Sequence, residues 1–394
     1  MRLPPASAPF LKAALAGGAR RWPALTAEET AALMAALEYQ GALGLVRDAV
    51  VRYGIEGVPA DAAWSLERGH KGIAARNAAL LSELGAVLDA LDAAAIPHVA
   101  LKGVALLATV YDDIGMRPMV DADILVPDDR LADAARALEA MGLEGTLLEA
   151  PGLEHHWPLV KAGPGVLPLT VELHRRLFAL APYDVLVAPG PLFDRAVPAT
   201  LRGRRIRVLA PVDLVLHAAG HLALQHASRE RLVWIADVDR AVRRWRDEDG
   251  FWDALGRRAA RWRLTPALAD ALAAAGAWFG TPAPSTVPEP TAAEYTVYRR
   301  GRSRAPVGLE GAKLLGDFRS SVGAGAKLRL ARAYLFPPAD FIRGHYGVDE
   351  AWKLPYYYGR RIVRGLGDVW THRRRSTPAG PEPEMWATGR QPRP

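Results

Sequence analysis

Two carboxylates lie inside an otherwise apolar run in the segment RPMVDADILV, residues 117–126. Side chains alternate along a β-strand, so Asp121 and Asp123 point one way while Ala122 and Ile124 point the other. Two like charges are costly to bury together, and a divalent cation with oxygen ligands is the simplest partner. The alternative is an edge strand whose polar face meets water, and the Asp-x-Asp spacing alone favours that alternative.

Two other features of the sequence favour the metal site. Lys102 and Gly103 follow a predicted strand and open a predicted helix, where backbone amides and an ammonium group can hold phosphate oxygens. A third carboxylate, Glu172, lies 49 residues after Asp123 in another strand-like segment. Three carboxylates on neighbouring strands beside such a turn indicate a two-metal phosphoryl-transfer site.

The order of helical and strand patterns predicts an α+β fold: a small mixed β-sheet between N-terminal and C-terminal helical segments. Thr26 is a candidate N-cap for the helical segment 26–50, and a longer helix follows it with leucines on one stripe. A further helix is predicted at residues 127–142. Strands are predicted at residues 96–101, 117–126, 167–174 and 204–211, with a hairpin within residues 195–208.

Composition shifts divide the chain into six predicted regions. These are an N-terminal helical region (1–95), an α+β core (96–211), a helical domain (212–280), a proline-rich linker (281–290), a C-terminal helical region (291–375) and a disordered tail (376–394).

The composition excludes several classes of site and partner. The 394 residues include no cysteine, which excludes disulfides, thiolate nucleophiles and cysteine-ligated metal centres. No apolar stretch reaches the ~18 residues of a membrane span, and no secretory signal is recognisable, so we expect a cytoplasmic protein without a membrane partner. The net charge of +7 is better explained by solvated helix faces than by a nucleic-acid groove.

A second group of polar residues comprises His217, His221 and Asp237. The four-residue histidine spacing puts both rings on one helical face, as in some zinc sites. A polar seam in which imidazole bonds to carboxylate is the favoured alternative, because the glutamate of zinc metalloproteases is missing. His174 shares a strand face with Glu172 and is the better candidate for the active cleft, while His155 and His156 are placed in a loop without a role.

The ordered set LKG, a tyrosine eight residues later, RPMVDADILV and VELH resembles the uncharacterised nucleotidyltransferase family of the DNA polymerase beta superfamily. The later segments LVLHAAGHLALQ, RLVWIADVDRAV and LFPPADFIRGHY are also similar to that family. The resemblance extends over about residues 70–350. The strand-turn-helix with Asp-x-Asp is shared across the superfamily. Lys-Gly and the His and Trp-Asp segments are more specific, and they narrow the resemblance to this one family.

The resemblance implies roles for individual residues. Asp121 and Asp123 would bind metal, and Glu172 would either bind metal or deprotonate an acceptor hydroxyl. The residues implied in nucleotide binding are Lys102, Gly103, Arg117 and His174. Arg117 would neutralise phosphate charge, although an arginine in a loop can equally be a surface residue.

The implied function is magnesium-dependent transfer of a nucleoside monophosphate, with manganese as an alternative cation and with release of pyrophosphate. The partners would be a nucleoside triphosphate such as ATP and an acceptor, which we expect to be a small molecule, peptide or protein rather than nucleic acid. A non-catalytic module that binds a nucleotide or partner on the same fold is the alternative. A zinc hydrolase built on His217 and His221 is a more distant one.

Overall fold

The computed structural model describes residues 7–145, 156–163, 166–178, 183, 186–225, 231–284, 287–302, 318, 324–337, 339–346, 348 and 350–375. The predicted tail at 376–394 and His155 lie outside the described residues. In the described part, no helix combines the length and the apolar character that crossing a membrane requires.

Seven strands form one mixed sheet in the order β3-β4-β5-β2-β1-β7-β6. The central pairs β2·β5 and β1·β7 are parallel, and the other neighbours are antiparallel. The strands are β1 (Val99–Ala100), β2 (Ala122–Leu125), β3 (Glu144–Gly145), β4 (His156–Gly163), β5 (Val166–His174), β6 (Val197–Leu201) and β7 (Arg204–Val208). The α+β fold with a mixed sheet is therefore confirmed.

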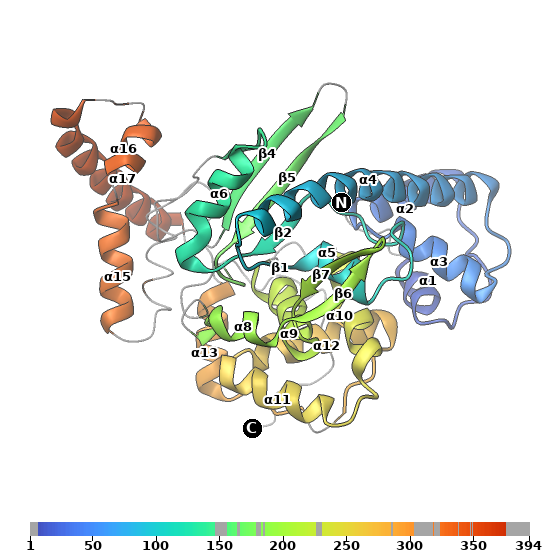
Figure 1. Cartoon of the computed structure of the whole chain (residues 1–394). Helices are drawn as coiled ribbons and strands as arrows, with labels where there is room; N and C mark the ends of the chain where they lie inside the picture. The colour runs from blue at the N-terminus through green and yellow to red at the C-terminus, as the bar shows by residue number, and fades with distance from the viewer. Residues whose placement is uncertain are drawn as a thin grey trace.

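The helices before and within the sheet are α1 (Ser7–Leu15), α2 (Ala27–Tyr39), α3 (Leu43–Tyr53), α4 (Ala60–Ala93), α5 (Lys102–Thr109), the 3-10 turn η1 (Asp128–Arg130), α6 (Leu131–Glu139) and α8 (Gly190–Arg195). Those after the sheet are α9 (Pro211–Gly220), the π-helical turn η2 (His221–Gln225), α10 (Leu232–Trp245), α11 (Phe251–Trp262), α12 (Thr265–Phe279), α13 (Ala292–Arg302), α15 (Ala324–Leu335), α16 (Ala339–Tyr346), the 3-10 turn η3 (Ala351–Lys353) and α17 (Leu354–Arg375). Figure 1 shows α4 and α6 on one side of the sheet, and α9 to α12 on the other.

The cap predicted at Thr26 is confirmed, because its side chain accepts from the amide of Glu29 while the Glu29 carboxylate accepts from the amide of Thr26. The helical segment 26–50 is not continuous, however. Gly41 breaks it with φ +66°, and a Cβ there would lie 3.0 Å from the side chain of Val233 on α10. This turn therefore contacts the later helical part of the chain.

Two further sequence expectations need correction. His156 does not lie in a loop but begins β4, a strand that the sequence did not reveal because Pro158 and Lys161 interrupt its apolar pattern. The helix predicted beyond Pro211 ends at Gly220 and continues as the π-helical turn η2. His217 lies in the α-helix and His221 in the π-helical turn. The zinc hypothesis assumed that both rings lie on one face of a single α-helix, and this assumption no longer holds.

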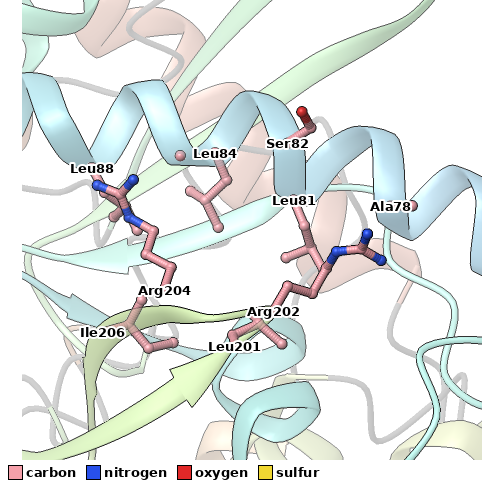
Figure 2. Close-up of a pocket in the computed structure, with 10 residues that line it drawn as sticks. Ala78, Leu81, Ser82, Leu84, Leu88, Leu201, Arg202, Arg204 and Ile206 are labelled. Atoms are coloured by element: carbon pink, nitrogen blue, oxygen red, sulfur yellow. The ribbon is translucent and has the colours of Figure 1, made fainter.

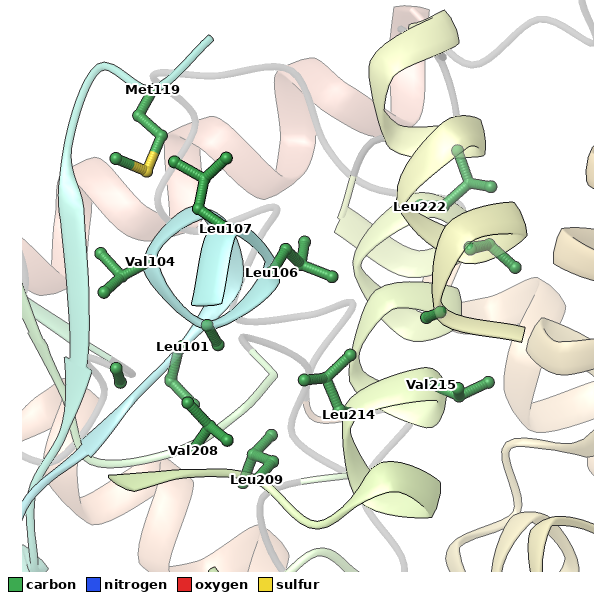
Figure 3. Close-up of a cluster of buried hydrophobic side chains, with 14 of the residues drawn as sticks. Leu101, Val104, Leu106, Leu107, Met119, Val208, Leu209, Leu214, Val215 and Leu222 are labelled. Carbon is green, nitrogen blue, oxygen red and sulfur yellow. The ribbon is translucent and has the colours of Figure 1, made fainter. Parts of the chain in front are cut away.

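The buried core links the sheet to the later helices through α5. Figure 3 shows α5 between the sheet and α9, with Leu106 of α5 and Leu214 of α9 facing the same space. Both leucines are buried, as are Leu101 and Val208 from β1 and β7 or their ends. Because α5 begins at Lys102, this packing holds the predicted phosphate-binding turn against a rigid layer on each side.

Candidate metal and nucleotide site

The parallel pairing of β2 with β5 brings the predicted acids together. Asp123 lies opposite Glu172, and Leu125 lies opposite His174. Glu172 and His174 are two residues apart on β5, so their side chains share one face of the sheet. Among the described residues, Asp123, Glu172 and His174 form the group that could hold a metal ion, with ligand atoms all within 4.8 Å of one another.

His174 connects the two carboxylates. Its Nε2 lies 2.8 Å from Oδ1 of Asp123 and 3.3 Å from Oε2 of Glu172. The imidazole is fully buried and Asp123 is 2% exposed, whereas Glu172 is partly exposed. The site is thus closed toward the sheet and open at Glu172, and the sequence correctly placed His174 in the same cleft as the acids.

Lys102 faces this cluster from the start of α5. Its Nζ donates to Oδ1 of Asp123 at 2.5 Å and lies 3.7 Å from Oε2 of Glu172. The backbone of Lys102 has φ +39°, a conformation that is uncommon for a residue with a side chain. Such strain is kept where the surrounding structure holds the residue, and here the buried ion pair does so.

The two aspartates differ in their electrostatic surroundings. Burial together with the charges of Asp123 and Glu172 raises the pKa of Asp121 to about 6. Burial also acts to raise the pKa of Asp123, but Lys102 and His174 outweigh it and hold that pKa well below its ordinary value. Asp123 is therefore already compensated by protein cations, whereas Asp121 carries a charge that a bound cation would relieve.

His156 on β4 packs against the same cluster. Its ring stacks on that of His174 at 5.3 Å between centroids, and its Nε2 lies 3.7 Å from Oε1 of Glu172. Burial lowers the pKa of His156 to about 4, so the ring is neutral near pH 7. This contact could not be predicted from the sequence, because His156 and His174 are brought together by the pairing of β4 with β5.

The loop before β2 is held by α4. The buried amide of Asn77 donates to the carbonyls of Ile114 and Arg117, both at 2.7 Å, and accepts from the amide of Met119 at 3.1 Å. Arg76 adds a hydrogen bond to the carbonyl of Met119 at 3.2 Å. Asn77 therefore sets the path of the chain just before Asp121. A lone asparagine within a helical pattern was no signal for this role.

Arg117, which was predicted to contact phosphate, belongs to the same loop and is 6% exposed. Its guanidinium donates to both carboxylate oxygens of Asp237 on α10, at 2.8 and 2.9 Å, and Tyr111 donates to the same carboxylate at 2.8 Å. Burial acts to lower the pKa of Arg117, but the charge of Asp237 raises it. Asp237 thus binds an arginine and a tyrosine, rather than an imidazole as the predicted polar seam required.

Gly103 lies where this loop crosses the start of α5. A Cβ on Gly103 would lie 2.5 Å from Sδ of Met119 and 2.7 Å from the guanidinium of Arg117. Both atoms would have to shift, and since the side chains of Met119 and Arg117 are buried, the crossing favours glycine. The need is one of close approach rather than backbone conformation, and it brings the phosphate-binding turn and the aspartate loop into contact.

The histidines of the second group line a cavity of about 20 Å³ between α5, α9 and α10, together with Lys102 and Asp237. This volume holds about one water molecule. Nε2 of His217 is buried without a hydrogen-bond partner in the described part of the chain, and burial lowers the pKa of His217 to about 3. His221 packs its ring edge-on against Trp234 at 5.5 Å. Neither histidine belongs to the metal-holding group found among the described residues.

The donor set fits a divalent cation. The carboxylates of Asp123 and Glu172 converge with the imidazole of His174. Burial and the nearby charges of both acids raise the pKa of Asp121, and the ammonium of Lys102 contacts Asp123. Carboxylate oxygens suit magnesium, and imidazole nitrogen is better suited to manganese or another transition metal.

The model of a family described as uncharacterised nucleotidyltransferase matches residues 26–280. Among solved structures, the chain is similar to an antigenic nucleotidyltransferase-like protein from Paracoccidioides brasiliensis, with 16% identity and a TM-score of 0.31, over 48% of this chain and 92% of that chain. No curated protein matches the chain.

Proposed function

The chain belongs to the uncharacterised nucleotidyltransferase family, and we propose that it transfers a nucleoside monophosphate from a nucleoside triphosphate to an acceptor. The acceptor oxygen attacks the α-phosphorus, the bond from that phosphorus to the oxygen bridging to the β-phosphate breaks, and pyrophosphate leaves. The acceptor proton passes to a carboxylate of the site. The proposed acceptor is a small molecule, peptide or protein.

The observation that carries this proposal is the convergence of Asp123, Glu172 and His174 within 4.8 Å, beside the ammonium of Lys102. Phosphoryl transfer depends mainly on positioning and on neutralising charge at the phosphates. Lys102 would neutralise phosphate charge directly, and the carboxylates would do so through a bound cation. The sheet and α5 hold the carboxylates and His174 from two sides, so the change that substrate binding would require is an exchange of partners by the Lys102 ammonium.

The proposed cation is Mg²⁺, held by Asp121, Asp123 and Glu172, with Mn²⁺ as the alternative that would also accept Nε2 of His174. A cation held there would supply Lewis-acid polarisation of the α-phosphoryl group and would offset charge on the leaving pyrophosphate. Asp121 fits this role because burial, together with repulsion from the neighbouring acids, raises its pKa, and a bound cation would favour its charged form.

The remaining residues act through position and charge. Lys102 and the first amides of α5 would hold the β- and γ-phosphates, which requires the ammonium to exchange its contact with Asp123 for one with phosphate. Glu172 is the most exposed of the three clustered side chains, which supports it as the group that would take the acceptor proton. Arg117 is a positioning residue in this scheme, because both oxygens of Asp237 occupy its guanidinium.

A second candidate function is binding of a nucleotide or a partner without catalysis. The direct ion pair of Lys102 with Asp123 favours this candidate, because it offsets the acidic charge with the protein's own cation. The two candidates differ in whether a divalent ion adds to nucleotide binding and whether pyrophosphate is released.

Thermal denaturation with each of the four nucleoside triphosphates, with and without Mg²⁺ or Mn²⁺, tests the proposal, because a ligand that binds only the native state raises Tm. Release of pyrophosphate from the stabilising triphosphate is measured in parallel. The expected result is metal-dependent stabilisation by at least one triphosphate, with pyrophosphate release that Asp121→Asn abolishes. Stabilisation that is the same without metal, and no release, would instead support the non-catalytic candidate.

A further inference from the structure

A groove lies between α4 and the β6-β7 hairpin. None of the candidate metal ligands Asp123, Glu172 and His174 lines it. Its volume is about 200 Å³. Figure 2 shows side chains from the helix and the hairpin lining it from two sides. Its floor is apolar and is formed by Leu84 and Leu88 of α4 with Leu201 and Ile206 of the hairpin, all of which are less than a tenth exposed.

Two arginines lie at this groove, and they differ in charge compensation. Arg204 is paired with the carboxylate of Asp89 on α4, which also raises the pKa of Arg204. Arg202 is exposed and has no ion-pair partner in the part of the chain that the structure describes. The groove therefore carries one uncompensated positive charge beside an apolar floor.

The backbone fixes where this charge lies. Arg202 and Gly203 form the two-residue turn of the hairpin, with φ +50° and +81°. Positive φ at both positions is typical of a type I′ turn, in which asparagine followed by glycine is preferred. Arginine at the first position strains the backbone of the turn. The geometry of the turn therefore does not explain why an arginine occupies this position.

The helix side of the groove is opened by a glycine. Gly85 lies in the middle of α4, where glycine destabilises a helix by about 1 kcal/mol relative to alanine. A Cβ there would lie 3.5 Å from the guanidinium of Arg204, in ordinary contact, so close packing does not require glycine. A larger side chain would extend into the groove and reduce its volume.

From these observations we propose that the groove is a binding site for a small carboxylate with an aliphatic body. The carboxylate pairs with Arg202, and the aliphatic chain lies on Leu84, Leu88 and Ile206. The volume is below the 300 to 1,000 Å³ that is usual for drug-sized ligands, which limits the occupant to a single unbranched chain of about the length of octanoate. This inference is independent of the proposed nucleotidyl transfer, because no groove residue belongs to the metal cluster.

Isothermal titration of the full chain with octanoate tests the proposal, with butanoate and 1-octanol as comparison ligands. Octanoate is expected to bind more tightly than butanoate, because it buries more methylene groups, and more tightly than the uncharged alcohol. The key variant is Arg202→Asn, which removes the charge and keeps a residue that the turn prefers. Its affinity for octanoate should fall by about tenfold, the value of one charge-assisted contact.

The matched control is Arg205→Ala, because Arg205 is exposed on the same hairpin and lies on the face opposite to that of Arg204 and Ile206. This control loses the same charge and should bind octanoate as the parent does. Gly85→Leu should abolish binding by filling the groove. Equal affinities of Arg202→Asn and Arg205→Ala, or equal binding of 1-octanol and octanoate by the parent, would overturn the proposal.

Discussion

Arg117 and Asp237 are 120 residues apart in the chain and form a buried bidentate ion pair, with both side chains less than a tenth exposed. The pair joins the loop before β2 to α10, and Tyr111 adds a hydrogen bond from the same loop. Through this contact, the helical part of the chain helps to place the aspartates of the candidate site.

Breaking this pair from one side should be strongly destabilising. Arg117→Met leaves the carboxylate of Asp237 buried with Tyr111 as its partner, and Asp237→Leu leaves a buried guanidinium. Each single variant is expected to lower the free energy of unfolding by about 3 to 5 kcal/mol. Urea denaturation measures this loss.

The double variant Arg117→Met with Asp237→Leu removes both charges together. It should recover much of the loss, because neither charge remains buried without its partner. If the losses of the two single variants simply add in the double variant, the two residues do not act as a pair.

The two aspartates of the Asp-x-Asp motif should respond oppositely to neutralisation in metal-free protein. Asp121→Asn removes a repelled charge and should stabilise the fold by about 1 to 3 kcal/mol, in line with the raised pKa of Asp121. Asp123→Asn removes the partner of Lys102 and His174 and should destabilise it. Thermal and urea denaturation without divalent ions measure both effects, and a shared sign would contradict this account of the site.

Lys102 should be needed for stability as well as for nucleotide binding. Lys102→Met leaves Asp123 and Glu172 without their ammonium partner and should lower the free energy of unfolding by about 2 to 4 kcal/mol. A divalent ion should then raise Tm more in this variant than in the parent, because it supplies the missing charge.

Lys102→Arg should restore nucleotide affinity only in part, since a planar fork does not replace a compact ammonium. An unchanged affinity for every triphosphate in Lys102→Met would remove Lys102 from the nucleotide site.

His217 should make the protein less stable in mild acid. Its pKa is about 3 in the folded chain because of burial and the charge of Lys102, whereas an exposed histidine titrates near 6.5. Below about pH 6.5 the unfolded chain therefore takes up a proton that the folded chain does not, and stability falls by up to about 1.4 kcal/mol per pH unit.

His217→Gln removes this titration and keeps a polar side chain of similar length. Urea denaturation between pH 7 and pH 4 should show a shallower loss of stability in this variant than in the parent. Parallel curves for the two proteins would show that His217 takes up its proton in the folded state as readily as in the unfolded one.

Much of the candidate site could be predicted from local pattern. The period of two on β5 correctly placed Glu172 and His174 together. The strand predicted at residues 117–126 is shorter than expected, because β2 begins at Ala122 and Asp121 lies just before it, so a common strand face for Asp121 and Asp123 stays a prediction. The Thr26 cap was equally visible, because a capping box leaves a signal within three residues. The close approach at Gly103 was not visible, because its partners Arg117 and Met119 lie 14 and 16 residues later in the chain. The predicted domain boundaries, and the roles given to the site residues, stay predictions.

Tertiary structure alone decided which charges compensate one another. Asp121 and Asp123 are equivalent in the sequence, yet only Asp123 is buried against Lys102 and His174. The contacts of Asn77 with the 114–119 loop and of Arg117 with Asp237 join segments 37 to 120 residues apart. The physical reason is that secondary structure follows from neighbours in sequence, whereas desolvation and Coulomb interactions depend on distances that exist only after the chain has folded.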